Sequence, residues 1–205
     1  MHDNQRKGPQ HQRLFEIASE QGGYFTAAQA RACRFSNALL AHHAKDGRFV
    51  RVGRGLYRFR QYPSSPREDV MVAWLAIGRD IALVSHESAL DLLGLSDVIP
   101  DAVHLTVPRS RRYRTRRAGV VVHTTTRGIR RGDSAVRDGI RVTSATRSIL
   151  DAAESGTAPE QIVAAVSQAI ERGLATRFRL VEAAGERSGR VRQLVEQALD
   201  EVASR

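Results

Sequence analysis

The spacing of apolar and polar residues in the first third of the chain predicts two short helices that follow each other closely. Thr26 offers a hydroxyl suited to a helix N-cap, and residues 27–33 after it are mostly good helix formers without β-branches. Ser36 offers a second capping hydroxyl in front of a predicted helix over residues 37–46. The turn between the two helices is too short to be a linker, so the pair is predicted to form a helix-turn-helix.

A hairpin is predicted directly after these helices. Gly47 ends the second helix, and residues 48–52 and 56–60 then alternate apolar with cationic side chains around Gly53-Arg54-Gly55. A helix over residues 9–21, with apolar residues at helical spacing, precedes the pair. Together these elements outline a winged helix-turn-helix. Its expected core consists of Phe25, Leu40, Val50, Val52 and Leu56.

The second predicted helix has one face that suits DNA. If Leu40 and Ala44 face the core, steps of about 100° per residue turn a small, polar face toward the solvent. Such a face fits a major groove, while hairpin arginines can hold the flanking phosphates. A small helical subdomain with a solvated hairpin would share much of this pattern. The exposed face would carry Ala38, Ala41, His42 and Lys45. The candidate DNA-binding residues are Thr26, Ser36, Asn37, Ala41, His42, Lys45, Arg51, Arg54 and Arg58.

The rest of the chain reads as a second domain. A Pro/Ser cluster at residues 63–66 marks the predicted boundary between a DNA-binding domain, 1–62, and a C-terminal domain, 63–205. Within the second domain, alternating and β-branched runs predict strands that are followed by capped helices. The predicted fold class is therefore α+β: a winged helix-turn-helix followed by a mixed α/β domain with a short sheet and then helices.

The elements of the second domain follow from local signals. Ser85 is the expected cap of a helix over 86–93, and Thr157 with Glu160 is expected to form a capping box. Strands are predicted over residues 102–107, 120–125 and 139–143. Helices are predicted from residue 67, over 86–93, 145–154 and 161–172, from residue 176, and along the apolar stripe 191–202.

The charge of the chain points to a polyanionic partner. The formal net charge is +10 with a pI near 11.0, and 30 of the 32 basic residues are Arg, whose planar fork suits phosphate and guanine. Residues 1–62 hold 11 basic and 4 acidic residues, against 21 and 18 in the remainder. The single Cys33 excludes an intrachain disulfide and a multi-cysteine zinc site. No apolar run approaches the roughly 20 residues of a membrane span, so the protein is expected to be cytoplasmic, without a membrane partner.

A second concentration of charge lies in the predicted sheet region. From Arg109 to Arg131 there are nine arginines and no acid. So dense a segment repels itself unless an anionic partner covers it, although a solvated loop that reflects composition would look the same. The candidate toxin- or RNA-facing residues are Arg109, Arg111, Arg112, Arg114, Arg116 and Arg117.

Catalysis has little support in the sequence. His104 and His123 lie on neighbouring predicted strands and His86 lies beside Glu87, but none of these pairs has a recognised metal-ligand spacing. A strand histidine is more often a half-buried structural residue. The chain also has no GxSxG, Walker or GxGxxG motif. We therefore expect no enzyme activity, no metal and no cofactor.

Three stretches resemble the AbiEi-type antitoxin family of abortive-infection toxin–antitoxin systems, the type IV class. They are GGYFTAAQARACRFSNALLAHHAKDGRFVRVGRGLYRF in the winged helix, and VSHESALDLLGLSDVIPDAVHLTVP and GIRVTSATRSILDAA beyond it. Similar winged helices also precede small nuclease-like domains that share a segment like the third stretch. Here about 50 helical residues remain after Asp151, without a candidate catalytic cluster.

The resemblance implies a protein that binds inverted repeats upstream of its own operon and represses it. It also implies that the C-terminal domain counteracts a nucleotidyltransferase-like toxin without a stable complex; the oligomeric state is left open, with a monomer among the alternatives. Ala38 and Ala41 stand where longer side chains would reach further toward the bases. More of the DNA recognition therefore depends on the wing and on DNA shape. The family motif carries over onto Ser36, Asn37, His42 and Lys45 for the reading helix and Arg51, Arg54 and Arg58 for the wing.

Two other functions fit the same residues. One is a solitary winged-helix transcription factor whose C-terminal domain senses a ligand or dimerises, and the neighbouring gene would separate it from an antitoxin. The other is a nucleic-acid-cleaving enzyme, which a cleavage assay with added divalent metal would reveal.

Overall fold

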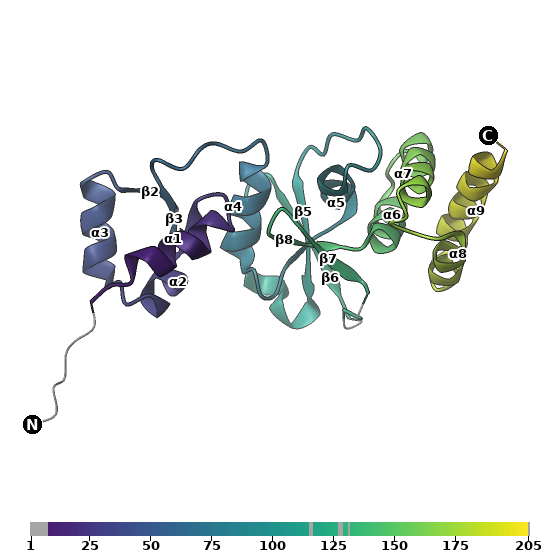
Figure 1. The fold of residues 1–205 in the computed structure, drawn as a ribbon. Coiled ribbons are helices and arrows are strands. Elements are labelled where there is room, and N and C mark those ends of the chain that lie inside the picture. The colour runs from purple at the N-terminus through teal and green to yellow at the C-terminus, as the bar shows by residue number, and fades with distance from the viewer. Residues whose placement is uncertain (1–7, 115–116, 127–128, 131, 205) are drawn as a thin grey trace, which may run out of the picture. The chain divides into compact units, whose positions relative to one another are not determined.

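A computed structural model describes residues 8–114, 117–126, 129–130 and 132–204. Its contacts divide the chain into two compact units, Met1–Ala76 and Ile77–Arg205 (Figure 1). The first unit is a winged helix-turn-helix and the second is a mixed α/β unit with one sheet and a series of helices, which confirms the predicted fold class. The boundary predicted at residue 62 lies before helix α4 (Glu68–Ile77), nearly all of which falls in the first unit.

The N-terminal unit has the expected helices and one strand more than expected. Helix α1 (His11–Ser19) precedes α2 (Ala27–Ala32) and α3 (Asn37–Lys45), which form the helix-turn-helix. Strands β2 (Phe49–Gly53) and β3 (Leu56–Phe59) form the predicted hairpin. The unpredicted strand β1 (Tyr24–Thr26) pairs antiparallel with β3, so the sheet has the order β1-β3-β2.

The core of this unit differs from the predicted one in the phase of β2. Phe49 is 2% exposed, whereas Val50, which was predicted to be buried, is 36% exposed. Successive side chains of a strand point to opposite faces, so an inward Phe49 turns Val50 outward. The core prediction was therefore wrong at Val50, and Val52, on the same face of the strand, is only partly buried. Phe25, Leu40 and Leu56 are buried as expected. Phe35 joins Phe25 and Phe49 in an aromatic cluster with rings 4.9–6.2 Å apart.

The C-terminal unit is built on a five-stranded sheet with the order β6-β5-β4-β8-β7. Strands β5 and β6 pair in parallel, as do β4 and β8, and the other two pairs are antiparallel. The two strands that the sequence did not predict are very short (β4) or exposed (β7). The strands are β4 (Leu83–Val84), β5 (Val103–Pro108), β6 (Val120–Thr125), β7 (Ser134–Arg137) and β8 (Ile140–Thr143).

Five α-helices accompany this sheet. Helix α5 contacts strand β5 and helix α6, and α6 contacts α7, α8 and α9 in turn, so the helices continue outward from the sheet (Figure 1). A 3₁₀ helix, Arg109–Arg114, follows β5. No helix within the described part of the chain is both long and apolar enough to cross a membrane. The helices are α5 (His86–Leu93), α6 (Ala145–Ser155), α7 (Pro159–Glu171), α8 (Arg177–Gly185) and α9 (Gly189–Ala203).

Two of the predicted caps in this unit do not form. Ser85 precedes α5 but makes no side-chain cap bond, because its Oγ lies 2.9 Å from Nδ1 of His86 and accepts a hydrogen bond from Thr106. The hydroxyl of Thr157 donates to Glu87 at 2.7 Å, and α7 starts with Pro159 at its first turn instead. The hydroxyls of Ser85 and Thr157 thus form hydrogen bonds with distant side chains instead of capping the helix that follows them.

Candidate functional site

Helix α3 turns the predicted face toward the solvent. Leu40 and His43 are buried, at 1% and 6% exposure, whereas His42 and Lys45 are exposed. Ala38 and Ala41 lie on the same open face, and Asn37 is exposed at its N-terminal end. The helical wheel inferred from the sequence therefore predicted the exposed face correctly, although His43 is more deeply buried than Ala44. A recognition helix contacts base edges through such a face, and that contact stays a prediction here.

The two capping hydroxyls hold the helix-turn-helix in place. Thr26 Oγ1 accepts from the backbone N–H of Gln29 at 3.2 Å, and the Gln29 side chain accepts from Thr26 N in return, which is a capping box. Ser36 Oγ accepts from the backbone N–H of Leu39 at 3.1 Å. Their first role is therefore to start α2 and α3. Ser36 is exposed and Thr26 is only partly so.

The wing presents two arginines to the solvent. Arg51 lies on β2 and Arg54 lies in the turn to β3, where Gly55 has a φ of +68° that favours glycine. Both arginines are exposed, and within the described residues neither side chain forms an ion pair or a hydrogen bond. Both guanidinium groups are therefore available to an anionic partner.

Arg58, the third arginine predicted for the wing, lies in a different environment. Its side chain is only 14% exposed, and its guanidinium donates to the carbonyl of Tyr62 at 2.7 Å and to Glu68 Oε1 at 3.2 Å. The guanidinium carbon also lies 5.5 Å from the centre of the Tyr24 ring. Arg58 therefore ties the hairpin to the first turn of α4.

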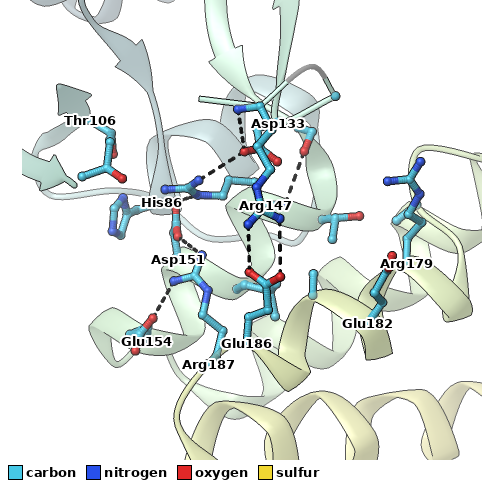
Figure 2. Close-up of a pocket in the computed structure, with 18 of the residues that line it drawn as sticks. His86, Thr106, Asp133, Arg147, Asp151, Glu154, Arg179, Glu182, Glu186 and Arg187 are labelled. Carbon is cyan, nitrogen blue, oxygen red and sulfur yellow. Dashed lines mark hydrogen bonds and ion pairs between the residues drawn. The ribbon is translucent and has the colours of Figure 1, made fainter. Parts of the chain in front are cut away.

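A polar cavity of about 890 Å³ opens in the C-terminal unit (Figure 2). Its wall includes the end of β6, one side of α6 along its whole length and part of α8. Among the described residues, four arginines and five acidic residues line it, so their charges nearly balance. The charged lining residues are Arg130, Arg147, Arg179, Arg187, Asp133, Asp151, Glu154, Glu182 and Glu186.

Asp151 is the centre of an ion-pair network in this cavity (Figure 2). Its carboxylate is 5% exposed and pairs with Arg147 Nε at 2.9 Å and with Arg187. Burial disfavours the charged form of Arg187, but Asp151 and Glu154 outweigh it, so the pKa of Arg187 is raised. The network joins α6 to the turn before α9, and Arg147 also reaches Asp133 at 3.6 Å.

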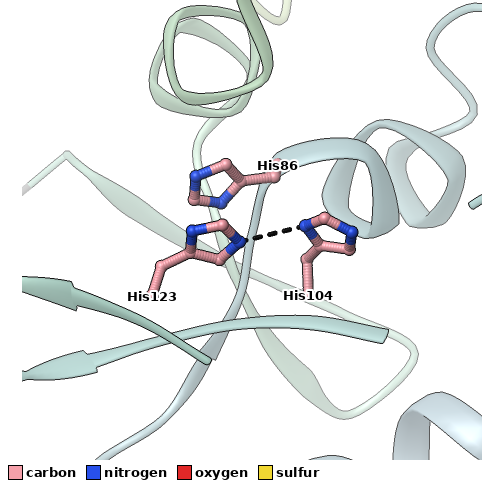
Figure 3. A group of neighbouring side chains, drawn as sticks. All are labelled: His86, His104 and His123. Atoms are coloured by element: carbon pink, nitrogen blue, oxygen red, sulfur yellow. Dashed lines mark hydrogen bonds between the residues drawn. The ribbon is translucent and has the colours of Figure 1, made fainter. Parts of the chain in front are cut away.

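Three histidines meet beside the same cavity (Figure 3). His104 Nδ1 lies 3.0 Å from His123 Nε2, and the ring of His86 stacks on that of His123 with centres 3.5 Å apart. The parallel register of β5 and β6 aligns His123 with Thr106, on the same face as His104. The spacing of these histidines in the sequence had argued against a metal site here. It did not reveal the cluster, because strand register rather than local spacing brings the three rings together. Glu87 points instead to Thr157.

The basic segment of the C-terminal unit is only partly described. Arg109 and Arg111 lie in the 3₁₀ helix after β5 and are exposed, as is Arg117 before β6. Arg116 lies outside the described residues, and so do the side chains of Arg112 and Arg114. The described part of the segment therefore presents arginines to the solvent.

Comparison with known families places the first unit. Residues 12–60 match the family model described as a transcriptional regulator, AbiEi antitoxin. The match runs from α1 to the end of β3 and confirms the resemblance for the first of the three stretches; it does not reach the other two. No curated protein matches the chain.

Comparison with solved structures concerns the fold alone. The crystal structure of the RV2827C protein from Mycobacterium tuberculosis is similar, with a TM-score of 0.58 and 15% sequence identity. The similarity covers 96% of this chain and 78% of that chain. It therefore includes the C-terminal unit, which the family model does not reach.

Proposed function

We propose that this chain, whose residues 12–60 match the AbiEi antitoxin regulators, represses its own operon through the winged helix and counteracts a nucleotidyltransferase-like toxin through its C-terminal unit. The family match supports a DNA-binding regulator of the antitoxin type in general. The observation that carries the DNA-binding part is the open face of α3 together with two exposed, unpaired arginines on the wing.

The proposed division of labour follows from side-chain chemistry. Asn37, His42 and Lys45 offer donors and acceptors for base edges in a major groove, and Ala41 leaves room for close approach. Few of these side chains are long, so DNA shape supplies a larger share of the specificity. Arg51 and Arg54 neutralise phosphates without reading sequence.

Replacing Arg51 and Arg54 together with Ala is expected to weaken binding to all duplexes alike. Each lost phosphate contact lowers the magnitude of the slope of log K against log salt by about 0.9, because fewer counterions are released. The measurement is the affinity of the full chain for its upstream DNA and for an unrelated duplex between 50 and 200 mM salt, a range over which such slopes are resolved.

Two further variants make this result specific. Arg179→Ala with Arg192→Ala removes the same charge from exposed positions of the C-terminal unit and should leave the slope unchanged. Lys45→Ala should instead change the preference between operator and unrelated duplex, at about 1–3 kcal/mol for a base contact. A slope that the wing variant leaves unchanged would show that the wing does not contact the backbone.

The proposed antitoxin activity rests on the basic segment from Arg109 to Arg117. A nucleotidyltransferase-like toxin acts on RNA or nucleotide phosphates, and a segment rich in arginine binds the same polyanions. Such competition requires no stable complex between the two proteins. The exposure of Arg109, Arg111 and Arg117 supports this role.

Changing the six arginines of this segment to Ser is expected to abolish rescue of growth when the chain is expressed with the toxin encoded beside it. The six are Arg109, Arg111, Arg112, Arg114, Arg116 and Arg117. Operator binding should persist, because the winged helix is untouched. The matched control changes the same residues to Lys and should retain rescue, since the charge remains. Full rescue by a folded Ser variant would exclude the segment from neutralisation.

The polar cavity favours a second candidate function. A cavity of about 890 Å³ lies within the size range of small-molecule sites, so the C-terminal unit could sense a ligand in a solitary transcription factor. A nucleotidyltransferase-like reading frame beside the gene supports the antitoxin, and its absence supports the sensor.

A further inference from the structure

Three histidine rings of the C-terminal unit bring their nitrogens close together. One ring nitrogen from each of His86, His104 and His123 lies within 4.8 Å of those of the other two. The 3.0 Å between His104 Nδ1 and His123 Nε2 is close to the spacing of about 3.3 Å that two nitrogens have when each binds zinc at about 2.0–2.1 Å in a tetrahedron. A small opening of this pair would admit a cation between them, and His86 would join it by turning out of its stack on His123, because an imidazole lone pair lies in the plane of the ring.

We propose that His86, His104 and His123 bind a divalent transition metal of the zinc class, with a coordination position open to the cavity of the C-terminal unit. Imidazole nitrogen suits Zn²⁺, Cu²⁺ and Ni²⁺ better than Mg²⁺ or Ca²⁺, which prefer oxygen. This site is independent of the winged helix and adds to the function proposed above.

The surroundings keep the rings in the form that binds metal. Burial is the first cause that lowers the pKa of all three histidines, and the other rings of the cluster lower the pKa of His86 and His123 further. Only neutral imidazole has a lone pair for a metal. The carboxylate of Asp151, which acts in the opposite direction on His86, is already shared by Arg147 and Arg187.

Hydroxyl contacts support the His86 ring. The hydroxyl of Ser85 lies 2.9 Å from His86 Nδ1 and accepts from Thr106 Oγ1 at 2.8 Å, and both hydroxyl residues are buried. Metal-bound imidazoles in proteins commonly have such partners. His86 also has a φ of +55°, which is unfavourable for a residue with a side chain and is found where a side chain must be aimed.

The open coordination position follows from what lines the cavity. His86, His123 and Thr106 form part of its wall, so a metal held by these rings would face the cavity. Three histidines complete only part of a tetrahedral shell. Water or a ligand in the cavity would therefore occupy the remaining position.

A second cluster of possible metal ligands is the natural comparison. His42, His43 and Asp46 lie together at the C-terminal end of α3, where Asp46 is the C-cap, but two of the three are exposed. Asp46 there already accepts from the backbone N–H of Arg48 at 3.0 Å and lies 3.2 Å from His43. This cluster serves as the internal control for adventitious binding.

The test uses the full chain without a histidine tag, stripped with a chelator and titrated with Co²⁺ and then Zn²⁺. The expected result is one visible Co²⁺ absorption per chain that Zn²⁺ displaces, together with a higher melting temperature in zinc. His104→Gln and His123→Gln should each lose more than about 100-fold in affinity, because the loss of a mere hydrogen-bond partner of a metal ligand already costs about 10–100-fold. His42→Gln should bind as the unchanged chain does.

Several outcomes would overturn the site. They are no binding by the unchanged chain at about 10 μM metal, full binding by His123→Gln, or a loss that follows His42→Gln instead. His104→Gln and His123→Gln are checked for folding by circular dichroism and by hydrogen exchange of the backbone amides in α6. If either fails to fold, nitrogen-15 spectra of the unchanged chain decide: zinc must shift the imidazole signals of His86, His104 and His123, and unshifted signals exclude the site.

Discussion

Replacing Asp151 with Ala is expected to lower the free energy of unfolding of the C-terminal unit by about 3–5 kcal/mol. The carboxylate is 5% exposed and pairs with two arginines whose side chains are themselves less than a fifth exposed. Its removal leaves the guanidinium groups of Arg147 and Arg187 close together without their shared counter-charge. Glu154 and Asp133 compensate only in part, because each touches one of the two arginines.

The measurement is hydrogen exchange of the backbone amides in α6, which reports the stability of this unit by itself. Asp200→Ala is the matched control, because it breaks the ion pair with Arg177 at a carboxylate that is 76% exposed. Exposed pairs contribute about 0–1 kcal/mol, so this control should change little. Equal effects of the two substitutions would show that the network in the cavity does not stabilise the unit.

Acid is expected to destabilise the C-terminal unit of the metal-free chain well above the pH at which carboxylates titrate. Burial foremost, then His123, lowers the pKa of His86 to about 3 from an ordinary 6.5; His104 and Arg147 act in the same direction, and Asp151 opposes them. Between these two pKa values His86 is therefore protonated in the unfolded chain and neutral in the folded chain. The contribution of His86 to the free energy of unfolding is fully present above pH 6.5. It falls by about 5 kcal/mol as the pH drops toward 3.

The same exchange measurement, repeated between pH 7 and pH 4 with correction for intrinsic exchange rates, follows this loss. His86→Gln removes the titrating group, so its stability should decline less steeply over this window. His11→Gln, at an exposed position of the N-terminal unit, is the control and should keep the original slope in α6. A slope that His86→Gln leaves unaltered would assign the acid sensitivity to other groups.

Local signals in the sequence determined the winged helix-turn-helix. The hydroxyls of Thr26 and Ser36 cap α2 and α3 where they were predicted to, because a cap needs only a side-chain oxygen and the amides a few residues on. Periodicity likewise predicted the open face of α3 and the strands β5, β6 and β8. These features depend on residues within one or two turns of each other.

Local signals could not predict which face of a strand is buried or which distant side chains form ion pairs. Both Phe49 and Val50 are apolar, so only packing against Phe25 and Phe35 decides which of them faces inward. Strand β4 has two residues and no pattern of its own; it exists because β5 and β8 flank it. In the sequence Arg58 resembles the other wing arginines, and only the folded unit shows that it forms an ion pair with Glu68.

The charged and histidine clusters were decided by tertiary structure alone. Asp151 and Arg187 are 36 residues apart and meet only because α6 packs against α8 and α9. His86, His104 and His123 come from α5, β5 and β6, and strand register brings their rings together. The sequence by itself thus determined the charge, the caps of α2 and α3 and the exposed face of α3. The pairing of strands and helices decided which distant polar side chains share a buried site, because burial and register depend on the whole unit.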